Sequence, residues 1–180
     1  MPTPQEDPSI SLTTAAVLSG RSLRTWQRRV EDGLVPRLGG AGGRTLVPFA
    51  AVRPALAVAL DDEDVAVLER ADQGDAAAQA DIGARLALAA LQAARREPAN
   101  PADGAAPALH FLTQAAQQGE ADAMHWLATV HAAGLAEAAE PGADTAEALA
   151  MMWLAKAAAH GHAIARHQLA QLMPGTPDKG

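Results

Sequence analysis

The fold is decided by the stretch LAKAAAHGHAIARHQLA (Leu154–Ala170), because the same phrase occurs twice more in the chain. Its earlier copies are LTQAAQQGEADAMHWLA (Leu112–Ala128) and VLERADQGDAAAQADIG (Val67–Gly83). The central glycine of each copy recurs after 45 and then 42 residues, at Gly74, Gly119 and Gly161. Apolar residues stand seven positions before and eight positions after each glycine, with alanine two and four after it. A period of this length with helical spacing inside each unit predicts an array of stacked helix pairs.

Each copy predicts one helix that ends near the glycine and a second helix that starts directly after it. Glycine suits this place because it adopts the left-handed conformation that ends a helix and reverses the chain. Proline and glycine in Glu97–Asp103 and Ala138–Asp144 predict loops between the pairs. Arrays of this kind commonly present surfaces to other proteins.

Composition predicts a chain without disulfides or a membrane span. Apolar residues make up 49% of it, aromatic residues only 3%, and there is no cysteine, so alanine-rich helices must pack closely. The start MPTPQEDPSI has neither the basic residues nor the apolar run of a secretory signal. No run is long and apolar enough to span a bilayer. We therefore expect a cytoplasmic protein with no membrane partner.

Charge divides the chain into a basic head and an acidic body. Residues 1–54 hold seven arginines against four carboxylates, a balance of +3 within a chain whose net charge is −7. Residues 55–180 hold seven basic and seventeen acidic residues, a balance of −10. This asymmetry predicts two different tasks for the two parts.

The basic head has the pattern of two short helices followed by a hairpin. Thr13 is placed to cap a helix over Ala15–Leu18, and Ser22 to cap a second helix from Leu23 to about Asp32, ended by Gly33. Leu23, Trp26 and Val30 are expected to form the buried stripe of that second helix. Two β-like runs, Leu34–Leu38 and Arg44–Val47, flank a glycine-rich tip, and another amphipathic helix is expected from Phe49 to Leu60.

These elements, in this order, resemble the winged DNA-binding head of the MerR and excisionase-like regulators over roughly residues 10–58. The matching positions are Gly33, Leu34, Pro36 and Arg37, then Gly42 and Arg44. The resemblance implies contact with duplex DNA, and arginine and glutamine are able to read base edges or grip phosphates. The residues expected at DNA are Arg21, Arg24, Thr25, Gln27, Arg28, Arg37, Gly42, Gly43 and Arg44. The long dimerisation helix of MerR regulators has no counterpart, so a homodimer would need another contact.

The repeats resemble the SEL-one-like repeat, a relative of the tetratricopeptide repeat, over about residues 63–173. The last unit carries Asp144, Ala148, Trp153, Lys156, Ala157, Ala158, Gly161, Ala165 and Leu169 in consensus order, with a longer Ala148–Trp153 spacing. Such repeats assemble protein complexes, and the resemblance implies binding of a protein partner. Phe111 and Trp153 stand at equivalent repeat positions, and so do His125 and His167. Together with Trp126 they are the expected contacts.

The histidines leave two further interpretations open. His160, His162 and His167 can in principle hold a metal, but no cysteine or carboxylate completes a familiar ligand spacing, so no metal is predicted. The second interpretation is a face of histidines that titrates below about pH 6.5. Catalytic residues and cofactors are not predicted, because the sequence has no phosphate loop, nucleophile elbow or paired carboxylates beside glycine turns. We expect a protein that is not an enzyme.

The predicted fold class is mainly α: a small N-terminal winged helix-turn-helix followed by a short α-solenoid of about three helix pairs. Its parts are a disordered N-terminus (1–9), the winged head (10–60), the repeats (63–173) and a disordered tail (174–180). The predicted function is a DNA-binding regulator or adaptor whose repeats bind a protein. The alternative is a scaffold that does not bind DNA, whose head docks protein or caps the repeats.

Overall fold

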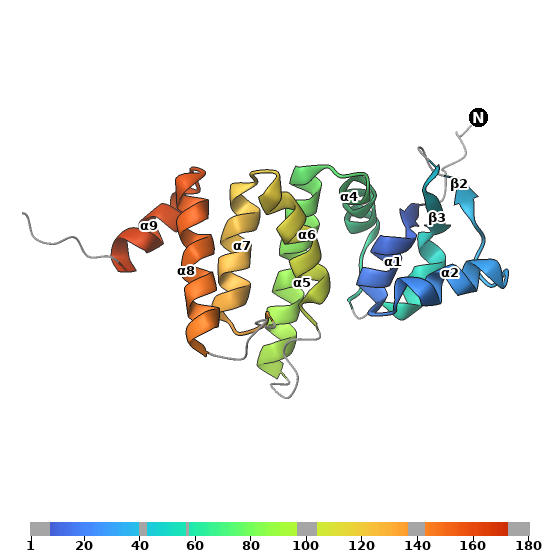
Figure 1. The fold of residues 1–180 in the computed structure, drawn as a ribbon, viewed down its shortest axis with the longest axis horizontal. Helices are drawn as coiled ribbons and strands as arrows, with labels where there is room; N and C mark the ends of the chain where they lie inside the picture. Colours follow the sequence, from blue (N-terminus) through green and yellow to red (C-terminus); the bar gives the residue numbers. More distant parts are fainter. Residues whose placement is uncertain (1–7, 40–42, 57, 97–103, 137–142, 173–180) are drawn as a thin grey trace, which may run out of the picture. The chain divides into compact units, whose positions relative to one another are not determined.

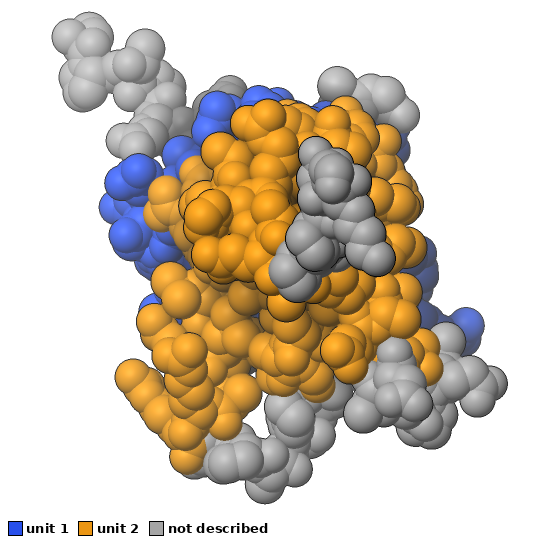
Figure 2. All heavy atoms as spheres, turned by 90° about the vertical axis from the view of Figure 1, so that its left-hand side faces the viewer, with its two compact units in different colours: residues 1–79 blue, residues 80–180 orange. Residues whose placement is uncertain are grey.

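The computed structural model of the chain describes residues 8–39, 43–56, 58–96, 104–136 and 143–172. The described residues are mainly helical with one small antiparallel sheet, which confirms the mainly α fold class (Figure 1). The chain divides into two compact units, residues 1–79 (unit 1) and 80–180 (unit 2), which Figure 2 distinguishes by colour. The predicted tails lie largely outside the described residues, although Ser9, expected in the disordered N-terminus, begins a strand.

Unit 1 holds a three-stranded sheet in the order β1–β3–β2. β1 (Ser9–Ser11) and β2 (Leu38–Gly39) both pair antiparallel with β3 (Thr45–Pro48), with Ile10 opposite Val47 and Leu38 opposite Leu46. A hairpin of β2 and β3 is present as predicted, but β2 overlaps the predicted run Leu34–Leu38 only at Leu38. β1 was not expected. Ile10 and Val47 are fully buried, so the added strand contributes directly to the core.

The first two helices of unit 1 each begin after a serine whose side chain caps the helix. α1 (Leu12–Ser19) begins at Ser11, whose hydroxyl accepts a hydrogen bond from Thr14 N–H, so the predicted cap at Thr13 is wrong. α2 (Leu23–Glu31) begins at the predicted cap, Ser22. Polar side chains at either position can satisfy the free amides of a first turn, and the β1 strand brings Ser11 to the right place.

The expected buried stripe of α2 is present only in part. Trp26 is 0% exposed and donates its indole N–H to Ser19 Oγ at 2.9 Å. Leu23 is 42% exposed and Val30 is half-buried, so Trp26 is the only fully buried residue of the three that were predicted. One large buried ring is enough to fix which face of this short helix points to solvent.

The segment after β3 is shorter than predicted. α3 covers Phe49–Val52 and continues as a 3-10 turn, η2 (Arg53–Ala55), instead of running on to Leu60. Pro54 explains the change, because it has no N–H for the α-helical hydrogen bond and its ring crowds the preceding turn.

α4 (Asp62–Asp72), expected as the first repeat helix, belongs to unit 1 and is tied to the head by hydrogen bonds. Ser9 N–H donates to Glu69 Oε1 at 2.7 Å, and Ser11 N–H donates to Asp72 Oδ2 at 3.0 Å. The division between the units falls inside α5 (Ala76–Arg96), between residues 79 and 80. The sequence prediction placed it near residues 60–63, because the repeat phrase carries no sign of these long-range bonds.

The repeat glycines end helices as the sequence predicts. Gly74, Gly119 and Gly161 have φ angles of 97°, 98° and 96°, in the left-handed region. Each lies between the two helices of a pair: α4 and α5, α6 (Ala106–Gln117) and α7 (Ala121–Ala132), and α8 (Ala143–Ala159) and α9 (Ala163–Leu172). α8 begins within the predicted loop 138–144, and residues 97–103 and 137–142 lie outside the described residues.

Within unit 2, α6 packs on α7, α7 on α8 and α8 on α9, so helices next to one another in sequence are neighbours (Figure 1). Their contacts are built largely from alanine, and fully buried alanines occur on every one of these helices: Ala108, Ala115, Ala123, Ala157 and Ala165. Small residues let the helix backbones approach closely but bury little apolar area each. None of the described helices is long and apolar enough to cross a membrane.

The closest helix approach gives a testable prediction at Gly83 of α5. A Cβ atom at this position would lie 2.8 Å from Leu112 Cγ and 3.2 Å from the Leu112 backbone nitrogen of α6. We expect Gly83→Val to destabilise unit 2 by about 1–3 kcal/mol through overpacking. Ala93→Val, at an exposed position of the same helix, is the control for a valine in α5 that meets no neighbouring helix, and valine is a better helix former than the glycine it replaces at position 83. Equal urea midpoints for the two variants would contradict this close approach.

Candidate nucleic-acid interface and protein-binding groove

The solvent face of α2 carries the side chains predicted to contact DNA. Burial of Trp26 on one side leaves Arg24, Gln27 and Arg28 exposed, with Arg21 exposed just before the helix. Thr25 is half-buried and its hydroxyl lies 2.8 Å from Ser22 Oγ, so it belongs to the helix cap. The structure therefore places three arginines and a glutamine on and just before one short helix.

These arginines are not neutralised by the protein itself. Within the described residues, none of Arg21, Arg24, Arg28 and Arg37 forms an ion pair with a carboxylate. Arg29 differs, because its guanidinium lies over the Trp26 ring at 5.4 Å from the centroid. Exposed Glu31 and Asp32 at the end of α2 reduce the positive charge there. The guanidinium groups of this face can donate hydrogen bonds to phosphate oxygens or to base edges.

Arg44, predicted to touch DNA from the wing, is held by α4. Its guanidinium donates to the Asp72 carbonyl at 2.9 Å and to Asp72 Oδ2 at 3.2 Å. The Arg44 side chain is 46% exposed, whereas that of Asp72 is only 4% exposed. Gly43 is exposed with φ of 78°, and Gly42 lies outside the described residues. Arg44 thus has a structural role that no pattern in the sequence predicts.

The residues predicted to bind a protein partner do not share one surface. Phe111 is 1% exposed and its ring meets that of His110 edge-on, so its prediction as a partner contact is wrong: it is a core residue. Trp126 and Trp153 are half-buried, and the Lys156 ammonium lies over the Trp153 ring at 4.5 Å.

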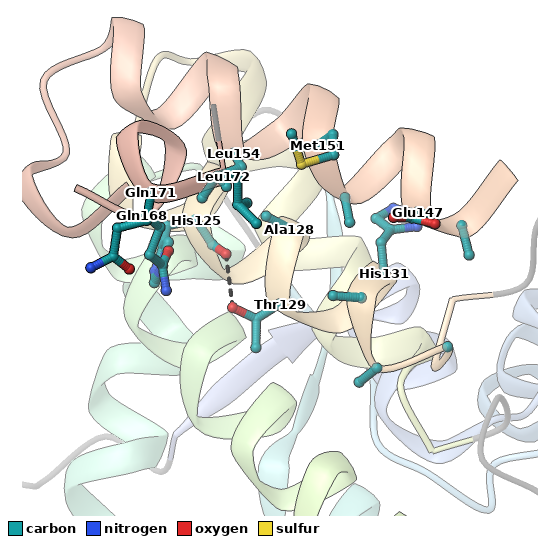
Figure 3. Close-up of a pocket in the computed structure, with 15 residues that line it drawn as sticks. His125, Ala128, Thr129, His131, Glu147, Met151, Leu154, Gln168, Gln171 and Leu172 are labelled. Carbon is teal, nitrogen blue, oxygen red and sulfur yellow. Dashed lines mark hydrogen bonds between the residues drawn. The ribbon is translucent and has the colours of Figure 1, made fainter. Parts of the chain in front are cut away.

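A groove in unit 2 is the concave feature that can receive a partner (Figure 3). It has a volume of about 910 Å3 and runs between α7, α8 and α9. His125 and Gln168 lie at one end and His131 and Glu147 at the other, with apolar side chains between them: Ala128, Met151, Leu154 and Leu172. Of the predicted contacts, His125 lines the groove, while His167 is exposed with Nε2 3.0 Å from Gln171 Nε2.

The sequence prediction missed the groove residues of α8 and α9. One signal was present, because a small residue stands nine positions after every repeat glycine, at Gly83, Ala128 and Ala170. Gly83 meets Leu112 and Ala128 lines the groove, so this position faces the next helix pair. Leu154, opposite, is the apolar residue seven positions before Gly161, whereas Met151 and Leu172 have no comparable repeat pattern.

Two histidines stack where α9 begins. The His125 and His162 rings lie 4.3 Å apart at 21°, and His162 Nε2 is 3.4 Å from Asp122 Oδ1. His162 Nδ1 accepts a hydrogen bond from Ala165 N–H at 3.0 Å, as an N-cap side chain does. Burial, together with the neighbouring His125, lowers the pKa of His162 below 6.5 in spite of Asp122. Burial also lowers the pKa of His110 and His131.

Neither a metal centre nor a likeness to known proteins assigns a function to these features. Among the described residues, no three histidine or carboxylate side chains are grouped so as to hold a metal ion, including the candidates His160, His162 and His167. No protein family, curated protein or solved structure gives a significant match to this chain.

Proposed function

We propose that the protein is a DNA-binding regulator or adaptor. In this proposal unit 1 is a winged helix-turn-helix head, with α2 as the recognition helix and the β2–β3 hairpin as the wing. The helix pairs form a short SEL-one-like solenoid that binds a protein partner through the groove of unit 2. The observation that carries the proposal is the cluster of exposed arginines on and beside α2 that have no carboxylate partner among the described residues.

The arginine face suits duplex DNA for physical reasons. A helix of nine residues fits the major groove, where guanidinium groups can bind guanine edges or flanking phosphates and Gln27 can bind adenine. Trp26 and the Ser22 cap hold the helix in place, so the backbone of α2 does not have to be ordered when DNA binds. One small head offers few contacts, and a second copy or the protein partner would add affinity.

The groove supports the second half of the proposal. Its floor and walls are mostly apolar, and its polar groups stand at the two ends, where they can orient a bound segment. A peptide or helix that places two or three apolar side chains against Met151, Leu154 and Leu172 fits this arrangement.

Salt-dependent binding tests the DNA proposal. If Arg21, Arg24, Arg28 and Arg37 each neutralise one phosphate, affinity should fall about 150-fold between about 50 and 200 mM salt. Arg24→Ala/Arg28→Ala should lower affinity at low salt and reduce the slope of log K against log salt by about 1.8. Fluorescence anisotropy with pooled duplex DNA and the full-length chain measures both quantities.

A matched double variant controls for the loss of two charges. Arg95→Ala/Arg96→Ala removes two exposed arginines from the last turn of α5, in unit 2, and should leave DNA affinity within about twofold. If both double variants lose affinity equally, contact is non-specific and α2 is not the reading helix. If the folded wild-type chain does not bind at low salt, the DNA proposal fails.

The scaffold alternative also has an observation in its favour. Arg44, the wing residue that the MerR-like resemblance places at DNA, is occupied by Asp72. Absence of DNA binding together with an intact groove would leave the protein as a scaffold that acts through unit 2.

A further inference from the structure

We propose that the stacked pair His125–His162 is a pH-sensitive latch that fastens α9 to α7 when neutral and releases α9 on protonation. The latch sits at the start of α9, where the chain leaves the Gly161 turn, and it is made from residues of both helices. The inference concerns the docking of α9 and holds whether or not the groove receives a partner.

The first element of the latch is the cap on α9. His162 Nδ1 can accept the hydrogen bond from Ala165 N–H only when that nitrogen carries no proton. The neutral ring must then hold its proton on Nε2, which faces Asp122 Oδ1 at 3.4 Å. Protonation places an N–H on Nδ1 against the N–H of Ala165, so the cap is lost. It also places a positive charge at the positive end of the helix dipole.

The second element is the contact with α7. His125 stacks on His162 and its Nε2–H donates to Gln168 Oε1 of α9 at 3.0 Å. The amide oxygen can only accept, so His125 also has a defined neutral tautomer, with its proton on Nε2. Stacking places the two ring centroids 4.3 Å apart, so His125 disfavours a proton on His162. Protonation of His162 therefore weakens the cap and the stack together.

Other charged groups do not cancel this effect. Asp122 on α7 attracts a proton to His162, but burial and His125 outweigh it, and the pKa of His162 lies below 6.5. The His162 side chain is only 12% exposed, whereas Asp122 is well exposed to screening solvent. Where burial is described, the turn, α8 and α9 carry further titratable residues, and these are exposed: Glu147, Lys156, His160, Arg166 and His167. Glu120 precedes α7, and His131 lies at the far end of the groove.

The sign of the pH effect follows from the lowered pKa. Well above pH 6.5 the ring is neutral in both the docked and the released states, and the full stability of the docked helix is present. As pH falls below 6.5, the released state takes up the proton more readily than the docked state. Docking of α9 therefore weakens until pH passes the pKa of the docked state. Because Gln168, Gln171 and Leu172 line the groove, release of α9 removes one of its walls.

Amide hydrogen exchange of the full-length chain tests the latch. Protection factors of α9, corrected for intrinsic exchange, should fall about tenfold between about pH 7.5 and pH 5.5. His162→Asn supplies a good N-cap that does not titrate, so its α9 protection should stay within about twofold over the same range. His167→Gln, an exposed histidine of the same helix, should behave like the wild type.

Two results would overturn the latch. One is unchanged wild-type protection of α9 at the lower pH, and the other is an equally steep fall in His162→Asn. A direct measurement needs no variant: the NMR titration of the His162 ring should give a pKa below 6.5, and a value at or above 6.5 contradicts the proposal. Loss of DNA binding or of partner binding would leave these results unaffected, so the two proposals can fail separately.

Discussion

Asp72→Ala is expected to destabilise unit 1 by about 3–5 kcal/mol, as the loss of one partner from a buried charged network does. Asp72 stands at the end of α4, and its carboxylate is 4% exposed. It accepts hydrogen bonds from the backbone and hydroxyl of Ser11, from the hydroxyl of Thr14 and from the Arg44 guanidinium. One side chain therefore joins β1, α1 and the segment before β3 to α4.

The large effect follows from what the substitution leaves behind. Ser11 and Thr14 are buried, so their donors cannot turn to bulk water when the carboxylate is removed. A buried donor without a partner costs about 1–3 kcal/mol, and several are affected here. Arg44 contributes less, because its half-exposed side chain can return to solvent.

Asp62→Ala is the matched control, since it makes the same change on the same helix at a fully exposed carboxylate. Asp62 lies in the first turn of α4, 3.8 Å from Arg53, and its removal should cost less than about 1 kcal/mol. Urea unfolding followed by tryptophan fluorescence reports on unit 1 when both variants are made in a Trp126→Phe/Trp153→Phe background, which leaves Trp26 as the remaining tryptophan. If Asp72→Ala shifts the midpoint no further than Asp62→Ala, the network does not hold α4 to the head.

Features with a local cause could be predicted from sequence. The left-handed glycines between helices and the Ser22 cap depend on residues within one turn, and each was found at the predicted position. The arginine face of α2 also follows locally, because one buried tryptophan fixes the orientation of a nine-residue helix. Its exposure was predictable; its contact with DNA stays a prediction.

Features that depend on distant partners could not be predicted. β1 is three residues long and too short for an alternating pattern, and its partner β3 lies more than thirty residues away in the sequence. Asp72 reads as part of a repeat, yet its hydrogen-bond partner Ser11 is 61 residues away. The unit boundary moved from the predicted linker into α5 for the same reason.

The histidine latch shows an intermediate case. In the sequence, His125 and His167 stand at equivalent repeat positions, and this pattern left open the interpretation of a histidine face that titrates. The structure instead pairs His125 with His162, which lies directly after the Gly161 turn. Repeat alignment compares equivalent positions of different repeats. The stack joins non-equivalent positions of neighbouring repeats, so the pair was missed.

Equivalent repeat positions also need not be equally buried, as the aromatic residues Phe111 and Trp153 show. Both stand eight positions before their repeat glycine, yet Phe111 is a core residue and Trp153 is half-buried. α8 and α9 form the last pair, with no further helix beyond them in the described part of the chain. A position that is enclosed in an inner pair is therefore open to solvent in the last one.

Phe111→Ala should lower the stability of unit 2 by about 3–5 kcal/mol, because removal of a fully buried ring adds a cavity to the lost burial. Trp153→Ala deletes a larger ring at the equivalent position and should cost less, since solvent already reaches that ring. The pair is a matched test of burial against side-chain size, and urea unfolding followed by far-UV circular dichroism measures it. A larger loss in Trp153→Ala would mean that size decides. If Phe111→Ala left stability unchanged and abolished partner binding, Phe111 would be a contact for the partner and not a core residue.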